Sequence, residues 1–202
     1  MVNFKELIKE DMKVCLNVSD KFKNLSVDKI KKISSNNKLP FSIALLNVTG
    51  ELNTGSIIRT AHNFGVEKVF IIGRSKLDAR SLVGCQNYTN IIKINALNND
   101  LLINETIFKN TMIENNLNPI FIETNGETLD KVDWKSIIDI NLNPCFVFGN
   151  EGRGISDNIL NLKKEFMFSK IISIPMHGVM RSHNVSVASG IIMWEYYKLL
   201  IS

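Results

Sequence analysis

One arginine interrupts the apolar stretch "SIIRTA", and its position suggests the binding of an anion. Arg59 follows the polar, glycine-containing loop "NVTGELNTG" and lies about one and a half turns into a helix that we expect to begin near Asn53 or Thr54. A guanidinium on the buried side of a helix needs an anionic or hydrogen-bonding partner, and its fork of donors matches a phosphate. The alternative is that Arg59 pairs with a core carboxylate or points to solvent.

A second stretch, "FVFGNEGRGIS", places three glycines directly after an apolar run. Gly149, Gly152 and Gly154 allow tight turns and a close approach of the backbone to a ligand. The pattern is neither GxGxxG nor GxxxxGK[ST], so it does not support a dinucleotide-binding protein or a nucleoside triphosphatase. It indicates a small-molecule loop without identifying the molecule.

A third stretch, "IPMHGVMRSHNVSVASG", puts polar residues at the start of an otherwise apolar C-terminal helix. Ser182 or Asn184 can cap this helix, but capping explains only one of the polar residues found there, which include Arg181 and His183. Free amides at a helix N-terminus, with polar side chains beside them, make a good site for a polar ligand. The helix beyond is apolar almost all round, which predicts burial in the domain or against a second subunit.

The histidines and cysteines do not suggest a metal site. The three histidines are not spaced like metal ligands, no carboxylate cluster joins them, and no CxxC pair occurs. We therefore expect no metal ion, and three reduced thiols in a cytoplasmic protein. These residues are His62, His177 and His183, and Cys15, Cys85 and Cys145.

Six short apolar runs recur along the chain and predict strands. Several lack polar alternation, which is typical of strands buried on both faces of a parallel sheet. Helical patterns separate them, so the sequence predicts an α/β fold with a mostly parallel sheet of about six strands and helices on both faces. The runs span residues 41–47, 68–73, 90–94, 118–124, 144–150 and 170–175, and the helical patterns span residues 54–64, 99–116, 155–164 and 185–200.

The first 38 residues look like a basic helical extension of this domain. Residues 1–33 show two short amphipathic patterns, and "SSNNKLP" reads as a linker that places the boundary of the domain, residues 39–202, near residue 39. The first 40 residues carry the whole net charge of +4. Such an appendage suits a polyanionic partner, although a solvated helical face is an equal alternative. No signal peptide and no run of about 18 apolar residues occurs, so we expect a soluble protein without a membrane span.

Together, the three polar stretches resemble the three motifs of the SpoU-type, or TrmH-like, RNA ribose methyltransferases of the SPOUT superfamily. The resemblance runs from about Leu45 to Tyr197. The matching residues are Asn53 and Arg59 in motif one, Phe148, Gly149, Glu151, Gly152 and Gly154 in motif two, and Ile174, Pro175, Met176, Gly178, Ser182, Asn184, Val185, Ser186, Val187 and Ala188 in motif three.

This resemblance implies a homodimer formed through the C-terminal helix, a C-terminal trefoil knot, and S-adenosylmethionine as cofactor. Knots are nearly absent from proteins, so patterning alone would not propose one. The partner would be RNA, either tRNA or rRNA. The implied cofactor contacts are Thr124, Gly149, Ile174 and His183. The family usually has Leu where this chain has His183, and a titratable ring there would make cofactor affinity depend on pH.

The implied reaction transfers a methyl group from the cofactor to a ribose 2′-hydroxyl, which must be aligned and deprotonated. In the family the counterpart of Arg59 is held to activate the hydroxyl. Because Arg keeps its proton, orienting a phosphate and stabilising alkoxide charge is an equal alternative. The resemblance assigns ribose positioning or pocket shape to Glu151, Ser182 and Asn184, and the geometry of motif one to Asn53. Methylation of an RNA base, or a non-catalytic RNA-binding module, are the rival functions.

Overall fold

A single parallel sheet of six strands forms the centre of the molecule. The computed structural model describes residues 17–74, 77–98, 100–138 and 142–202. The strand order is β3-β2-β1-β5-β4-β6, and every neighbouring pair is parallel, which confirms the predicted sheet. The strands are β1 (Ser42–Leu46), β2 (Val69–Ile72), β3 (Ile91–Ile94), β4 (Leu117–Thr128), β5 (Asn143–Phe148) and β6 (Lys170–Ser173).

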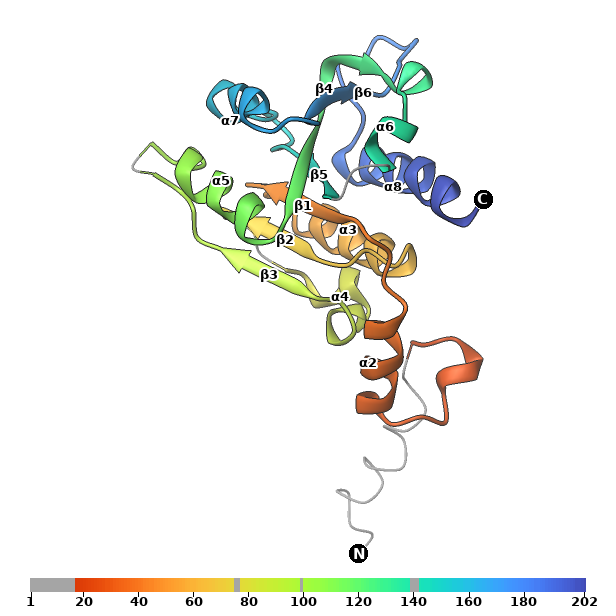
Figure 1. Ribbon diagram of the computed structural model, residues 1–202. Coiled ribbons are helices and arrows are strands. Elements are labelled where there is room, and N and C mark those ends of the chain that lie inside the picture. The colour runs from red at the N-terminus through yellow and green to blue at the C-terminus, as the bar shows by residue number, and fades with distance from the viewer. Residues whose placement is uncertain (1–16, 75–76, 99, 139–141) are drawn as a thin grey trace, which may run out of the picture.

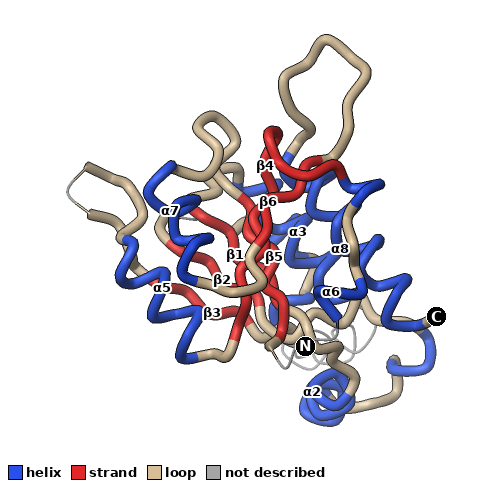
Figure 2. Tube along the Cα trace, turned by 45° about the horizontal axis from the view of Figure 1, so that its top comes forward, coloured by secondary structure: helices blue, strands red, loops and turns tan. Residues whose placement is uncertain are grey.

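Helices cover both faces of this sheet, as the unalternating strands predict. Along β1, Ile43 and Leu45 enter one hydrophobic core while Ala44 and Leu46 enter the other, and all four are buried. The first core contains side chains of α3 (Glu51–Asn63), α6 (Lys135–Ile138) and α8 (Val185–Ile201). The second contains side chains of α5 (Glu105–Glu114) and α7 (Asp157–Asn161). Figure 2 shows the two helical layers on either side of the red strands.

Strand β4 runs further than the expected residues 118–124. Its pairing with β6 shifts between Ile122 and Glu127, so that the strand re-pairs with Ile172 and Ser173 beyond an irregular stretch. Gly126 lies in this stretch, where an added Cβ would come within 2.4 Å of the Ile171 carbonyl oxygen. A residue without a side chain is therefore needed for the two strands to meet again.

Three helices differ from the expected bounds. Helix α3 begins at Glu51, so Asn53 lies inside its first turn instead of at its start. Helix α5 begins only at Glu105, because the Asn104 side chain caps it by accepting from the Ile107 amide. The pattern over residues 155–164 divides into α7 and the 3₁₀ helix η4 (Leu162–Glu165). The C-terminal helix matches its prediction.

The described part of the N-terminal segment consists of the 3₁₀ helix η1 (Asp20–Phe22) and helix α2 (Val27–Asn36). Helix α2 confirms the second amphipathic pattern, whereas the first lies mostly outside the described residues. Ser26 caps α2, and Ile30 is buried. Figure 1 shows α2 below the sheet, close to α4 (Ala79–Leu82). The division of the chain near residue 39 and the trefoil knot both stay predictions. None of the described helices is long and apolar enough to cross a membrane.

Candidate active site

A cavity of about 500 Å³ lies at the carboxyl edge of the sheet, where residues of β4 meet the loops after β5 and β6. Ligands bind at this edge in open α/β folds. All four residues predicted to contact the cofactor, Thr124, Gly149, Ile174 and His183, line the cavity. The same walls contain three of the five residues predicted to be catalytic, namely Glu151, Ser182 and Asn184.

Glu151 joins the glycine loop after β5 to the loop that precedes α3. Its Oε1 accepts hydrogen bonds from the Gly50 amide (2.9 Å) and from Asn53 Nδ2 (3.1 Å), and its Oε2 accepts from the Thr49 amide (3.1 Å). Burial opposes the ionised form, but the hydrogen bonds from Asn53 and from the backbone amides outweigh it and lower the pKa of Glu151. A carboxylate at the N-terminus of α3 is also favoured by the helix dipole.

Asn53 and Asn184 continue this network from the first motif to the third. Asn184 Nδ2 donates to Asn53 Oδ1 at 3.1 Å, while Asn184 Oδ1 caps α8 by accepting from the Ser186 amide at 2.9 Å. Asn53 therefore donates to Glu151 and accepts from Asn184, although it does not itself line the cavity. The capping of α8 explains why Asn184 carries a side-chain acceptor. The hydrogen bond to Asn53 explains why this side chain is an amide rather than a hydroxyl, because it also needs a separate donor.

The glycine loop folds back on itself tightly enough to require glycine at two positions. The amide and carbonyl of Asn150 both bond to Gly154, at 3.1 and 2.8 Å. A Cβ on Gly149 would lie 2.4 Å from the Gly154 carbonyl carbon, and Gly154 itself has φ +67°. The Asn150 side chain fixes the turn by accepting from the amides of Gly152 and Arg153.

Glu123 is a cavity residue that sequence reasoning missed. Its Oε1 accepts from the Ile155 amide at 2.6 Å and its Oε2 from the Thr124 amide at 3.3 Å. The signal was present, because a lone acidic residue closes the apolar run "IFIE" at the edge of the sheet where ligands bind. Arg181 also lines the cavity and donates to the Gly152 carbonyl at 3.1 Å.

Two predicted catalytic residues do not line this cavity: Asn53, which is hydrogen-bonded to its walls, and Arg59. The Arg59 side chain is exposed and lines a second cavity, together with His62 and Cys85, further along α3. The expectation that Arg59 lies on the buried side of its helix is wrong. Six residues turn a helix by about 600°, so Asn53 and Arg59 point in different directions.

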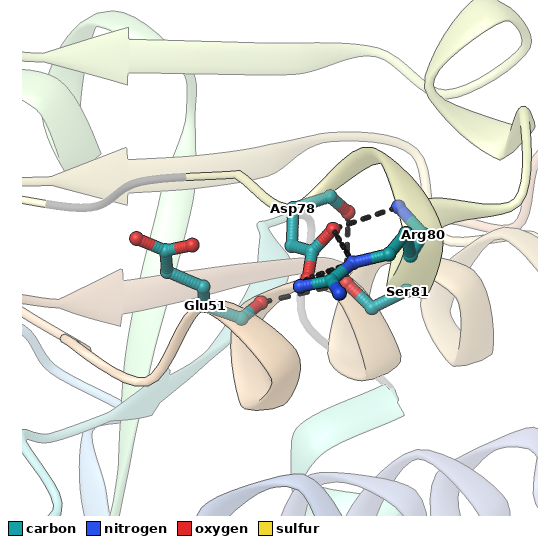
Figure 3. A network of polar contacts seen from close by, with 4 residues as sticks. All are labelled: Glu51, Asp78, Arg80 and Ser81. Atoms are coloured by element: carbon teal, nitrogen blue, oxygen red, sulfur yellow. Dashed lines mark hydrogen bonds and ion pairs between the residues drawn. The ribbon is translucent and has the colours of Figure 1, made fainter.

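A separate polar group, which sequence reasoning did not find, supports the start of α3 (Figure 3). Asp78 and Arg80 form an ion pair at 2.8 Å, and hydrogen bonds from Arg80 lower the pKa of Asp78. Ser81 Oγ donates to the Asp78 carbonyl at 2.9 Å and lies 3.5 Å from the Glu51 carbonyl. Figure 3 shows the Glu51 carboxylate pointing away from this group. A Cβ on Gly55 would meet Ser81 Oγ, so α3 lies close against α4.

The described residues hold no group of three or more His, Cys, Asp or Glu side chains that could bind a metal ion.

Comparison with known proteins yields one protein family and several relatives. The profile of the SpoU rRNA Methylase family matches residues 40–194. A putative TrmH family tRNA/rRNA methyltransferase of Bacillus subtilis, YacO, is 27% identical over 85% of this chain and 64% of its own length. The 23S rRNA (guanosine-2'-O-)-methyltransferase RlmB of Haemophilus influenzae is 28% identical over 86% of this chain and 65% of its own length. The chain thus spans slightly less than two thirds of these relatives.

Solved structures show the same fold at lower identity. The TrmH/SpoU tRNA modifying enzyme of A. aeolicus superposes with a TM-score of 0.65 at 22% identity, over 85% of this chain and 81% of that one. An AdoMet-bound rRNA methyltransferase of Sinorhizobium meliloti superposes with a TM-score of 0.63 at 21% identity, over 86% of this chain and 61% of that one.

Proposed function

The chain belongs to the SpoU rRNA methylase family, and on this premise we propose that it transfers a methyl group from S-adenosylmethionine to a ribose 2′-hydroxyl of tRNA or rRNA. The observation that carries the proposal is the assembly of the site. Residues of the second and third motifs line one cavity, and Asn53 of the first motif is hydrogen-bonded to two of them. The names of relatives, which include a guanosine-2'-O-methyltransferase, support the choice of ribose.

The walls of the cavity suit S-adenosylmethionine. Ile122, Ile174 and Val185 provide apolar surface for an adenine ring, while the Glu123 carboxylate offers acceptors for hydroxyl or ammonium groups. Thr124, Gly149 and His183 complete the set of residues that would hold the cofactor. When bound, the cofactor supplies an electrophilic methyl group on a sulfonium.

Glu151 and Asn184 position the site and do not remove the proton. Both Glu151 oxygens already accept hydrogen bonds and its pKa is lowered, so the group is a poor base. Both polar atoms of the Asn184 amide are likewise engaged. Ser182 is exposed in the cavity wall and has no hydrogen-bond partner among the described residues, so its hydroxyl is free to meet the ribose.

Arg59 binds an RNA phosphate in this scheme, since a guanidinium keeps its proton. It lies outside the cavity of its own chain. It can therefore reach the reaction only along an RNA strand that follows α3, or from a second copy of the chain.

The functional unit is a homodimer that forms through α8. Val187, Trp194 and Ile201 follow one another at intervals of seven residues and so lie on one stripe of this helix. They are 52%, 46% and 60% exposed. An apolar stripe of this kind on a single chain is typical of a surface that a second copy covers. A cytoplasmic location stays a prediction.

Mass spectrometry of nucleosides tests the reaction. The purified protein is incubated with S-adenosylmethionine and unmodified tRNA and rRNA, which are then digested. We expect a new 2′-O-methyl nucleoside. A methylated base would show that the protein is an RNA base methyltransferase instead. Absence of product from either RNA, together with no binding of S-adenosylmethionine, would favour a non-catalytic RNA-binding protein.

A further inference from the structure

A second cavity, of about 520 Å³, lies between the N-terminal segment and the far end of α3. Residues of η1 and α2 form one side, and residues of α3 and the 3₁₀ helix η2 (Cys85–Asn87) form the other. Ser34 Oγ fastens α2 here by donating to the Tyr88 carbonyl at 3.0 Å. The main-chain amide of Leu39 also bonds to the Gly65 carbonyl at 2.7 Å. The N-terminal segment is thus fixed against the domain where the cavity forms.

Positive charge gathers in this cavity without a counter-ion. Lys38 and Arg59 line it beside His62, whereas its described lining contains no Asp or Glu. Neither Lys38 nor Arg59 forms an ion pair or a side-chain hydrogen bond with any described residue. Burial lowers the pKa of Lys38, and burial together with the nearby Lys38 lowers the pKa of His62. A bound anion would relieve this crowding of like charges.

Tyr88 is one of the residues that line this cavity, and it has an unused hydrogen-bonding group. Its hydroxyl is buried with no partner among the described residues. A buried polar group of this kind lowers stability unless a ligand satisfies it. A phenol donates well to an anionic oxygen, so the orphan hydroxyl points to the same ligand chemistry as the two cations.

Helix α3 runs from the hydrogen-bond network of the first cavity to the second cavity. Asn53 belongs to the hydrogen-bond network of the first cavity and Arg59 lines the second, and six residues of helix separate them by about 9 Å along the axis of α3. A stacked strand covers that distance in about three nucleotides.

We propose that the second cavity binds a phosphodiester group of the RNA strand close to the nucleotide that is methylated. Lys38 and Arg59 contact the phosphate, and the Tyr88 hydroxyl donates to one of its oxygens. The identity of the ligand rests on the proposed function. The inference gives the segment before residue 39 a defined role: it closes a phosphate site that the methyltransferase domain supplies only in part.

Two lysine variants of the same segment test the inference. Lys38→Met removes a cavity cation and keeps the aliphatic stem, while Lys31→Met removes an exposed cation of α2 that does not line the cavity. Binding of unmodified tRNA is measured by fluorescence anisotropy between 0.05 and 0.3 M salt. One contact with a single-stranded phosphate contributes about 0.7 to the salt slope, which corresponds to about fivefold in affinity at 0.1 M salt. We expect this fall in tRNA affinity for Lys38→Met and less than half of it for Lys31→Met. Equal falls in affinity for the two variants would show that the segment is only a solvated basic face.

Tyr88→Phe provides an independent test. Removing an unsatisfied hydroxyl should leave the melting temperature unchanged or raise it, while tRNA affinity falls. A variant with wild-type tRNA affinity would overturn the assignment of Tyr88.

Failure of this inference can be told from failure of the proposed function. Lys38→Met should bind S-adenosylmethionine like the wild type in calorimetry. If the wild type methylates RNA while Lys38→Met keeps the wild-type affinity and salt slope, the phosphate site is refuted and the function stands. If the wild type binds tRNA with the Lys38-dependent slope but methylates neither RNA, the function is refuted and the site stands.

Discussion

Replacing Glu151 with Gln should weaken the link between the loop before α3 and the glycine loop, although the side chain keeps its shape. The substitution replaces one carboxylate oxygen with an NH₂ group, which cannot accept a hydrogen bond. At one oxygen position this group would face the Gly50 amide and Asn53, and at the other it would face the Thr49 amide. Charge-assisted hydrogen bonds contribute about 1.5–3 kcal/mol when buried, and partial exposure reduces the expected loss to about 1–2 kcal/mol. For a chain of this length that lowers Tm by about 2–8 °C.

The pH dependence of this loss identifies its cause. The folded-state pKa of Glu151 is lowered, so its contribution to stability is present above the unfolded-state pKa of about 4.3 and is lost as pH falls through the folded value. The difference in Tm between wild type and Glu151→Gln should therefore be constant near neutral pH and shrink below about pH 4. Glu114→Gln, at an exposed carboxylate without an ion pair among the described residues, is the matched control. If the difference in Tm between wild type and Glu151→Gln is the same at pH 3.5 and pH 7, the ionised Glu151 carboxylate is not the cause of the loss.

Three further variants test the site, the mechanism and the dimer. Gly149→Ala places a Cβ about 2.4 Å from the Gly154 backbone, so we expect a loss of about 1–3 kcal/mol in urea unfolding and weaker S-adenosylmethionine binding in calorimetry; a neutral variant would show that the loop can relax. Arg59→Ala should abolish methyl transfer and keep cofactor affinity, and full transfer would remove Arg59 from the mechanism. Trp194→Glu should yield monomers in light scattering, whereas an unchanged dimer would place the interface away from the α8 stripe.

Much of the fold could be predicted because its strands carry the signal locally. Buried parallel strands read as unbroken apolar runs, and all six occur where such runs lie. Helix starts were less accurate because they depend on single capping contacts. The Asn104 cap makes α5 begin later than the sequence pattern predicts. The loop before α3 is held by Glu151, a residue about one hundred positions away.

In the candidate site, too, features encoded within one short segment could be predicted, whereas contacts between distant segments could not. The second and third family motifs predict residues that share the cavity, since each of them follows a strand of one parallel sheet, whereas Asn53 and Arg59 of the first motif do not line it. They do not reveal that Glu151, Asn53 and Asn184 bond to one another, because those contacts join segments far apart in sequence. The position of Arg59 could have been predicted from the sequence. The spacing of the motif alone places Asn53 and Arg59 on different sides of a helix.

Alkaline hydrolysis of labelled RNA tests whether this cavity directs a methyl group to a ribose oxygen. RNA is incubated with the protein and S-adenosylmethionine labelled on the methyl group, then treated with alkali, which cleaves only beside a free 2′-hydroxyl. We predict label in alkali-resistant dinucleotides for the wild type and little or none for Arg59→Ala. Label in mononucleotides would place the methyl group on a base and contradict ribose methylation.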